Sequence, residues 1–243
     1  MIEVRGLTKR FGGRTAVDAL DLRAGPGEIY GFLGPNGAGK TTTIRLLLGI
    51  LAPDAGTVLV CGQPVRRGDR AARYLVGAVA EVQHLYGDMT CAEYLHFFAA
   101  LYGIDGARAR VAAMLEMVGL RDRARDRAID LSKGLQQKLG LARALLHDPP
   151  VLILDEPVSG LDPHGIREVR EILCRERERG RLVFLSSHVL SEVERTADRI
   201  GMLRQGRLVF EGTIEAVMAR HATLEEAFLA VTGEAASAAE PTH

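Results

Sequence analysis

Short apolar runs alternate along the chain with longer stretches whose apolar residues recur at helical spacing. Glu28–Leu33, Val151–Leu154 and Leu182–Leu185 are apolar almost throughout, which is typical of strands buried on both faces. Further strands are predicted at Met1–Arg5, Thr15–Leu22, Thr57–Cys61, Leu75–Ala80, Ile200–Leu203 and Leu208–Phe210.

Helix starts are indicated by two T-x-x-E capping boxes, Thr90 with Glu93 and Thr223 with Glu226. Ser132 is a third predicted cap, because an apolar stripe at helical spacing follows it. Helices are predicted over 42–50, 90–101, 107–118, 132–146, 165–179, 189–197 and 223–231.

This alternation predicts an α/β fold with a mainly parallel sheet covered on both faces. Antiparallel strands, joined by a Gly12-Gly13 turn, precede it. The helical block at about 85–147 interrupts the alternation, so we expect it to form an inserted subdomain. Residues 234–243 have no periodicity and are expected to form a flexible tail.

Composition excludes several classes of protein. The 243 residues have a formal net charge of zero and a pI of about 7.1, which argues against a nucleic-acid partner. Cys61, Cys91 and Cys174 are scattered, so we predict neither a disulfide nor a metal site from them. The apolar stretches fall short of the ~20 residues that span a bilayer, and the N-terminus lacks the apolar core of a signal peptide. We therefore expect a soluble, cytoplasmic protein.

The segment GPNGAGKT at 34–41 fits the pattern GxxxxGK[ST] of a phosphate-binding loop, between a predicted strand and a predicted helix. Its glycines would let backbone N–H groups converge on phosphate oxygens. Lys40 is expected to reach the β- and γ-phosphates of a nucleotide, and Thr41 to bind Mg²⁺. The predicted cofactor-binding residues here are Gly34, Pro35, Asn36, Gly37, Ala38, Gly39, Lys40, Thr41 and Thr42.

Two acids, Asp155 and Glu156, end the apolar run VLIL. Ligand sites of open α/β sheets lie at the carboxyl ends of the strands, where these acids are expected. We predict that Asp155 binds Mg²⁺ and that Glu156 is catalytic, orienting and polarising the attacking water.

The segment LSKGLQQK at 131–138 resembles the LSGGQ signature of the ATP-binding-cassette (ABC) family. Ser132 and Gly134 are kept, whereas Lys133 replaces a glycine and Leu135 replaces the glutamine. A serine hydroxyl and a glycine N–H at a helix N-terminus suit an anion site. In the family, this site closes over the γ-phosphate held by the other monomer.

Other segments follow in the family's order. Ser159-Gly160-Leu161-Asp162 is similar to the D-loop, and His188 to the switch histidine that contacts the γ-phosphate. The resemblance thus implies a catalytic role for His188 and nucleotide contacts for Ser132, Gly134 and Asp162. Phe11 resembles the aromatic residue that stacks on adenine, although a core role is its alternative.

The family also has a glutamine that contacts Mg²⁺ after a strand. In VGAVAEVQ, Glu81 aligns best with that position, and Gln83 two residues later is the alternative. We predict Glu81 as a metal ligand because carboxylate oxygens bind Mg²⁺ well.

The resemblance covers roughly residues 2–232. It implies an ABC ATPase domain over 1–233, with a RecA-like P-loop NTPase core at about 1–84 and 148–212. The inserted helical signature subdomain would occupy about 85–147 and C-terminal helices 213–232. It also implies an ATPase that closes as a homodimer or as a heterodimer with a second ABC ATPase.

The cues LSKGLQQKL, LYGDMT and TLEEAFLAVTG resemble bacterial drug- and antibiotic-export subunits. The implied function is to power export of a small molecule (drug, antibiotic or lipid-like) through a separate transmembrane permease. Such a protein would be peripheral on the inner face of the cell membrane. The alternatives are an importer ATPase subunit and a non-transport ABC ATPase acting on nucleic acid or the ribosome.

Overall fold

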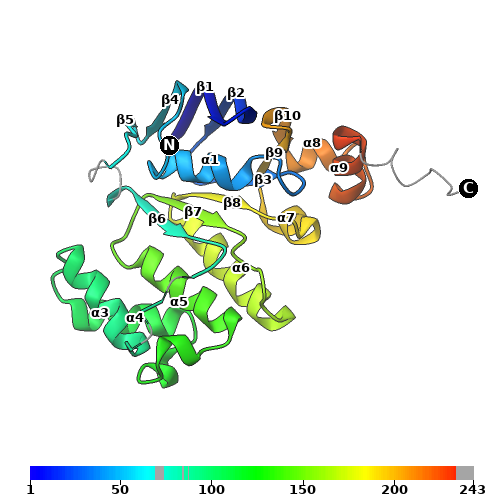
Figure 1. Cartoon of the computed structure of the whole chain (residues 1–243). Helices are drawn as coiled ribbons and strands as arrows, with labels where there is room; N and C mark the ends of the chain where they lie inside the picture. Colours follow the sequence, from blue (N-terminus) through cyan, green and yellow to red (C-terminus); the bar gives the residue numbers. More distant parts are fainter. Residues whose placement is uncertain (69–73, 84, 87, 234–243) are drawn as a thin grey trace, which may run out of the picture.

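The computed structural model describes residues 1–68, 74–83, 85–86 and 88–233. Its elements form layers (Figure 1): a small antiparallel sheet, the helix α1 (Lys40–Leu47), a larger sheet, and a lower set of helices. The predicted tail 234–243 lies outside the described residues. No helix in the described part of the chain is both long and apolar enough to cross a membrane.

The small sheet has four antiparallel strands in the order β2-β1-β4-β5. They are β1 (Ile2–Phe11), β2 (Arg14–Ala24), β4 (Ala55–Val60) and β5 (Gln63–Pro64). The predicted first strand was too short, since β1 continues to Phe11 through register shifts that break its alternation. The strand β5 was not predicted, because two residues are too few to show a periodicity.

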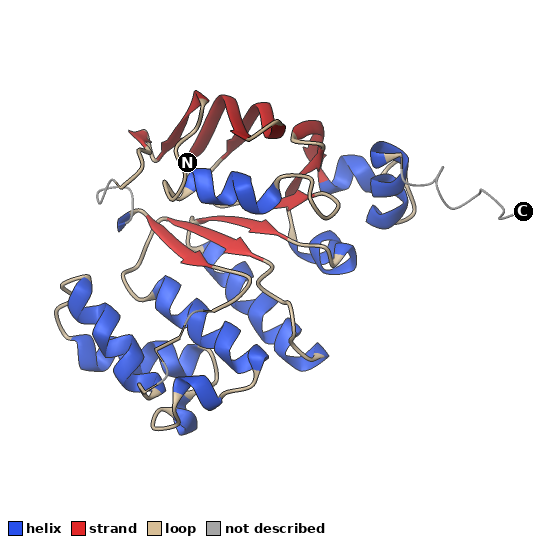
Figure 2. Ribbon diagram, viewed as in Figure 1, coloured by secondary structure: helices blue, strands red, loops and turns tan. Residues whose placement is uncertain are grey.

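The larger sheet has six strands in the order β10-β9-β3-β8-β7-β6 (Figure 2), all parallel except β10. They are β3 (Ile29–Leu33), β6 (Val76–Val79), β7 (Val151–Asp155), β8 (Leu182–Ser186), β9 (Arg199–Arg204) and β10 (Arg207–Thr213). Every residue of β3, β7 and β8 is buried, which explains their continuous apolar runs. The predicted mainly parallel sheet is confirmed.

Alternate residues of β8 face two different cores. Leu182 and Phe184 join the core beneath the antiparallel sheet, where the Phe184 ring stacks on Tyr30 at 5.4 Å between centroids. Val183 and Leu185 join the core that the lower helices cover. The large sheet is therefore covered on both faces, as predicted, but by α1 and a second sheet on one side.

The remaining helices lie mainly below the large sheet or beyond its β9–β10 edge (Figure 2). They are α3 (Cys91–Leu101), α4 (Ala107–Met117), α5 (Lys133–Leu145), α6 (Pro163–Glu178), α7 (Leu190–Thr196), α8 (Ile214–Met218) and α9 (Leu224–Thr232), with 3-10 turns η1 (Arg121–Arg123) and η2 (Ala128–Asp130). The helix α5 sits close against β6 because Gly77 has no Cβ, which would otherwise overlap the Ala144 carbonyl.

The capping predictions were largely right. The Thr90–Glu93 box forms in full at α3, and the Ser132 hydroxyl accepts from the Leu135 N–H at α5. The box at Thr223 forms only in half, since the Glu226 carboxylate accepts from the Ala222 N–H rather than from the N–H of Thr223. The T-x-x-E pattern therefore predicted where α9 begins, but only one of the two hydrogen bonds of a capping box forms there.

His147 provides a test of the packing between α3 and the large sheet. Its ring stacks on Tyr102 at 4.1 Å, and burial lowers its pKa from an ordinary value near 6.5 to about 4. The folded state therefore binds fewer protons than the unfolded state between these values. The contribution of His147 to the free energy of unfolding is therefore complete above about pH 6.5 and is lost as the pH falls towards 4.

We expect His147→Phe, which keeps an aromatic ring but cannot titrate, to reduce this acid sensitivity. The part of the loss between pH 7 and 5 due to His147 should be on the order of 1 kcal/mol, discounted for its partial exposure. Urea unfolding at both pH values measures it. Equal losses in the two proteins would exclude His147 as the cause.

Candidate functional site

The loop 34–39 between β3 and α1 requires glycine at two positions. Gly37 and Gly39 have φ of +77° and +112°, in the region that side chains disfavour. A Cβ on Gly39 would also overlap the carbonyl oxygen of Ala16 on β2. The antiparallel sheet thus presses on the loop and fixes its shape.

Lys40, the first residue of α1, is buried and its ammonium lies within the loop. It donates to the carbonyl oxygens of Gly34 at 2.6 Å and Pro35 at 3.4 Å. Burial lowers the pKa of Lys40, and nearby carboxylates oppose that shift. These carboxylates belong to Glu156, Asp155 and Glu81. The fold therefore places the partly desolvated ammonium of Lys40 near three carboxylates.

Ser186, the last residue of β8, holds Asp155 at the end of β7 and Glu156 just after it. The Ser186 hydroxyl donates to Asp155 Oδ1 at 2.5 Å. The Glu156 N–H lies 3.2 Å from both the Ser186 hydroxyl oxygen and its carbonyl oxygen. Ser186 was not predicted as a site residue, although it ends an apolar strand as Asp155 does, and this position was a usable signal.

Glu156 and His188 form a direct pair. His188 Nδ1 lies 2.7 Å from Glu156 Oε2, and the His188 N–H donates to the same oxygen at 3.2 Å. The Glu156 side chain is 9% exposed, whereas that of His188 is 60% exposed. Glu156 has a φ of +51°, a strained conformation for a side chain of this size. The carboxylate is thereby fixed at the edge of an open space.

That space is a cleft of about 590 Å³. It is lined by Phe11, Arg14, Ala16, Pro35, Asn36, Gly37, Gly39, Lys40, Thr41, Thr42, Glu81, Asp155, Glu156 and His188. The structure therefore brings together residues that lie up to 177 positions apart, from Phe11 to His188. The half-exposed ring of Phe11 lies at the cleft, where a flat ligand could reach it.

Glu81 lines the cleft, whereas Gln83 does not. The Gln83 amide donates to the Ala80 carbonyl at 2.6 Å and to Gln137 Oε1 at 3.1 Å. Its side chain thus packs against α5. Of the two candidates, Glu81 is the one whose position suits a contact in the cleft.

Five predicted nucleotide contacts lie outside the cleft's lining. Gly34 and Ala38 belong to the phosphate loop itself, whereas the other three come from more distant segments. Ser132 caps α5, and Gly134 packs against Gly160 and Leu161 in the next turn of chain after Glu156. The Asp162 carboxylate accepts from the Gly165 N–H at 2.7 Å and caps α6. Within a single chain these residues form no part of the cleft.

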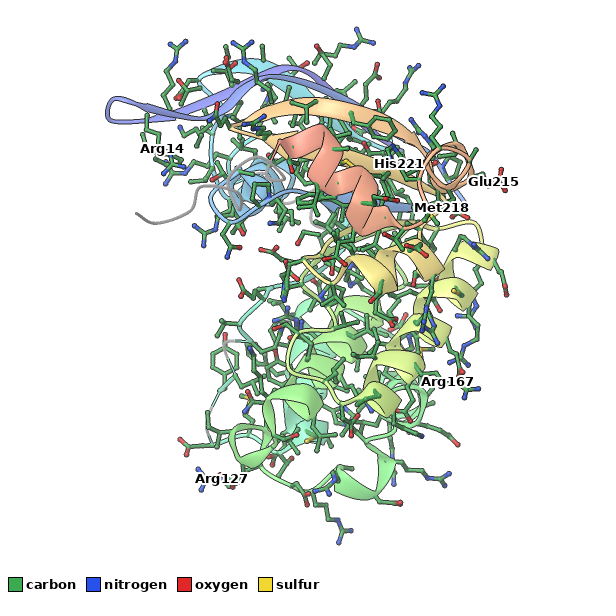
Figure 3. The ribbon with its side chains drawn as sticks, turned by 90° about the vertical axis from the view of Figure 1, so that its right-hand side faces the viewer. Arg14, Arg127, Arg167, Glu215, Met218 and His221 are labelled. Carbon is green, nitrogen blue, oxygen red and sulfur yellow. The ribbon has the colours of Figure 1, made fainter. Side chains whose placement is uncertain are left out.

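Arg14 was also missed by the sequence analysis. In Figure 3 it lies near the loop of the β1–β2 hairpin, on the opposite side of the molecule from α8. Its guanidinium donates to the Gly37 carbonyl at 3.0 Å, so it adds positive charge to the phosphate loop. An arginine at the start of a strand gives no local sign of this contact.

The donors in the cleft fit Mg²⁺. The described residues include no cluster of three His, Cys, Asp or Glu side chains that would form a complete metal cage. Mg²⁺ usually takes one or two protein oxygens, with water and phosphate oxygens completing its shell. Thr41 and Asp155 supply such oxygens beside the loop, and Glu81 could supply another.

Comparison with known sequences gives consistent matches. The family model described as ABC transporter matches residues 17–159. The chain is 46% identical, over 86% of its length and 68% of the relative's, to the uncharacterized ABC transporter ATP-binding protein YhcH of Bacillus subtilis (strain 168). It is 44% identical to the Nod factor export ATP-binding protein I of Paraburkholderia xenovorans (strain LB400), over 90% of this chain and 72% of that one. It is 42% identical to the bacitracin transport ATP-binding protein BcrA of Bacillus licheniformis, over 87% and 69%.

Solved structures share the fold. One described as an ATP binding subunit of an ABC transporter superposes with a TM-score of 0.89 at 30% identity, covering 96% of this chain and 99% of that one. The ATP-binding cassette MJ0796, solved as a dimer bound to ADP and Pi, has a TM-score of 0.80 at 24% identity, over 88% and 99%. At that identity, the second match shows the fold alone.

Gly39→Ala tests the shape of the loop. The new Cβ would meet the Ala16 carbonyl at a φ that alanine rarely adopts, so we expect ATP affinity to fall at least tenfold and stability by about 1–3 kcal/mol. Titration with a fluorescent ATP analogue and thermal unfolding measure the two effects. Gly13→Ala is the matched control, since nothing lies within 4 Å of its Cβ position.

Proposed function

The chain belongs to the ABC transporter family and is an ATPase subunit of the exporter type, and we propose that it drives a separate membrane permease by closing around ATP as a dimer. One observation carries the proposal: Lys40 faces Asp155 and the Glu156–His188 pair across one cleft. A loop for phosphates and a fixed carboxylate at the same place are the parts that ATP hydrolysis needs.

We assign the phosphates of ATP to the loop 34–41, with Lys40 reaching the β- and γ-phosphates. The Lys40 ammonium would exchange its bonds to Gly34 and Pro35 for bonds to phosphate oxygens. These bonds are stronger because both partners are charged. The adenine would stack on the exposed ring of Phe11 at the other end of the cleft.

Glu156 would orient the attacking water. Its carboxylate is fixed by two contacts to His188, and its backbone is fixed by Ser186. A base held in place contributes by positioning as well as by accepting a proton. His188, whose ring is largely exposed, would contact the γ-phosphate while keeping Glu156 in register.

Mg²⁺ would bind through Thr41 and Asp155, with Glu81 as a further ligand. When bound, the ion neutralises charge on the β- and γ-phosphates. Ser186 orients Asp155 for this purpose by donating to one of its oxygens.

Ser132, Gly134 and Asp162 would act across a dimer. They lie outside the cleft of their own chain, so a contact with nucleotide requires another chain. The proposed arrangement is head to tail, with Ser132 and Gly134 of each chain facing the γ-phosphate bound by the other. The partner would be a second copy or a second ABC ATPase.

An apolar surface beside α3 would receive the permease. Tyr86, Phe97 and Leu101 are exposed there, and the Tyr86 and Phe97 rings meet edge to face at 5.5 Å. A groove of about 220 Å³ between α1, β6 and α3 lies in the same region, lined in part by Ile50 and Phe98. Tyr86 is five residues from Glu81, so this surface is connected to the cleft by one short segment.

We propose a cytoplasmic segment of the permease as the occupant, which would hold this subunit on the inner face of the cell membrane. The relatives' names include Nod factor export and bacitracin transport. They support export of a small molecule, such as a drug, an antibiotic or a lipid-like compound, as the work done.

Glu156→Gln tests the chemistry. The amide cannot accept a proton from water, so we expect hydrolysis to fall at least 100-fold while ATP binding persists. The variant should accumulate an ATP-dependent dimer, measured by light scattering with size-exclusion chromatography. Lys40→Ala is the matched control, since it should neither bind ATP tightly nor dimerise. Hydrolysis at the normal rate by Glu156→Gln would overturn the assignment.

Tyr86→Asp with Phe97→Asp tests the docking surface. Charges on an apolar contact should reduce the permease recovered with the tagged protein from detergent-solubilised membranes at least tenfold. ATP hydrolysis by the isolated subunit should stay within about twofold of wild type, since neither side chain lines the cleft. Val209→Asp, another exposed apolar residue but on β10, is the control. Unchanged recovery of the permease would exclude this surface.

A further inference from the structure

Lys133 is a cation placed where a helix repels cations. It is the first residue of α5, whose first turn contains no acid to balance it. The N-terminus of a helix carries partial positive charge, so lysine there is unfavourable without an anion. The family resemblance gives glycine at this position, so a small residue would satisfy the fold.

Among the residues that the structure describes, Lys133 forms no ion pair. Its amine donates instead to the Ser159 hydroxyl at 3.4 Å, a long bond between exposed groups. A neutral hydroxyl at this distance holds an ammonium only weakly. The charge of Lys133 is therefore available to a stronger acceptor.

The stem of Lys133 lies over the turn that follows Glu156. Gly160 has a φ of +78°, and a Cβ there would be 2.9 Å from Lys133 Cδ. Gly134, the next residue of α5, packs against the same turn through the Gly160 carbonyl. These contacts position the stem, while the amine at its tip is held only by Ser159.

We propose that Lys133 is an additional ligand for the γ-phosphate. In the closed dimer its amine would leave Ser159 and bind a γ-phosphate oxygen of the ATP held by the facing chain, beside Ser132. The inference rests on the proposed head-to-tail dimer. The exchange replaces a long bond to a neutral hydroxyl with a bond to a multiply charged oxygen, which is shorter and stronger.

This assignment gives Lys133 a specific effect. The γ-phosphate exists in ATP and not in ADP, so Lys133 would favour dimer closure with ATP without changing the affinity of the single chain for ADP. The cleft that binds ADP within one chain is not lined by Lys133.

The test compares Lys133→Gln and Lys133→Arg in the Glu156→Gln background, where ATP is not consumed. Light scattering gives the ATP concentration at half-maximal dimer. We expect Lys133→Gln to raise it roughly tenfold, the loss of one charge-assisted bond, and Lys133→Arg to stay near the parent. The difference should shrink at high salt. Arg108→Gln, which removes an exposed charge from α4, should leave the ATP concentration unchanged.

Ser159→Ala separates the proposed ligand from a positioning residue. If Ser159→Ala alone matched the shift of Lys133→Gln, and the double variant added nothing, Lys133 would act only by holding Ser159, which overturns the proposal. An unchanged ATP requirement in Lys133→Gln, or an equal loss of ADP affinity, also overturns it. Failure of the Glu156→Gln parent itself to dimerise with ATP would instead overturn the proposed dimer, and this inference with it.

Discussion

The parallel pairing of β7 with β8 determines the geometry of the site. In this register Asp155 lies opposite Ser186, so both strands end at the same level and their polar residues meet. The same edge receives the loop after β3, because β3 pairs with the other side of β8. Strand pairing thus brings the segments of Lys40, Glu156 and His188 to one edge. A shift of β7 by one residue would reverse the faces of its side chains and separate Asp155 from its partner.

Two cores maintain this edge. One, above the large sheet, holds α1 and the antiparallel strands against the phosphate loop, and contact with Ala16 on β2 leaves no room for a side chain at Gly39. The other, below, seats α5 on β6 across the bare backbone of Gly77. The start of the signature helix and the cleft are therefore parts of one packed body, although they belong to different layers.

Much of this could be predicted from the sequence. Runs buried on both faces identified β3, β7 and β8, and local motifs located the loop at Lys40 and the two acids Asp155 and Glu156. The missed features depend on contacts between distant segments. Ser186 and Arg14 gain their place at the site only when β8 joins β7 and β2 approaches the loop. The strand β5 is too short to show a period, and the proposed roles of Ser132 and Asp162 depend on a second chain.

The left-handed backbone of Glu156 has a consequence for the evolution of this chain. Glycine would adopt that conformation with less strain, and asparagine or aspartate would also tolerate it better than glutamate. Fold stability therefore favours losing the glutamate, while the proposed chemistry requires it. Variants selected only for thermal stability should drift towards these residues at position 156. Retention of glutamate there would thus indicate selection for turnover.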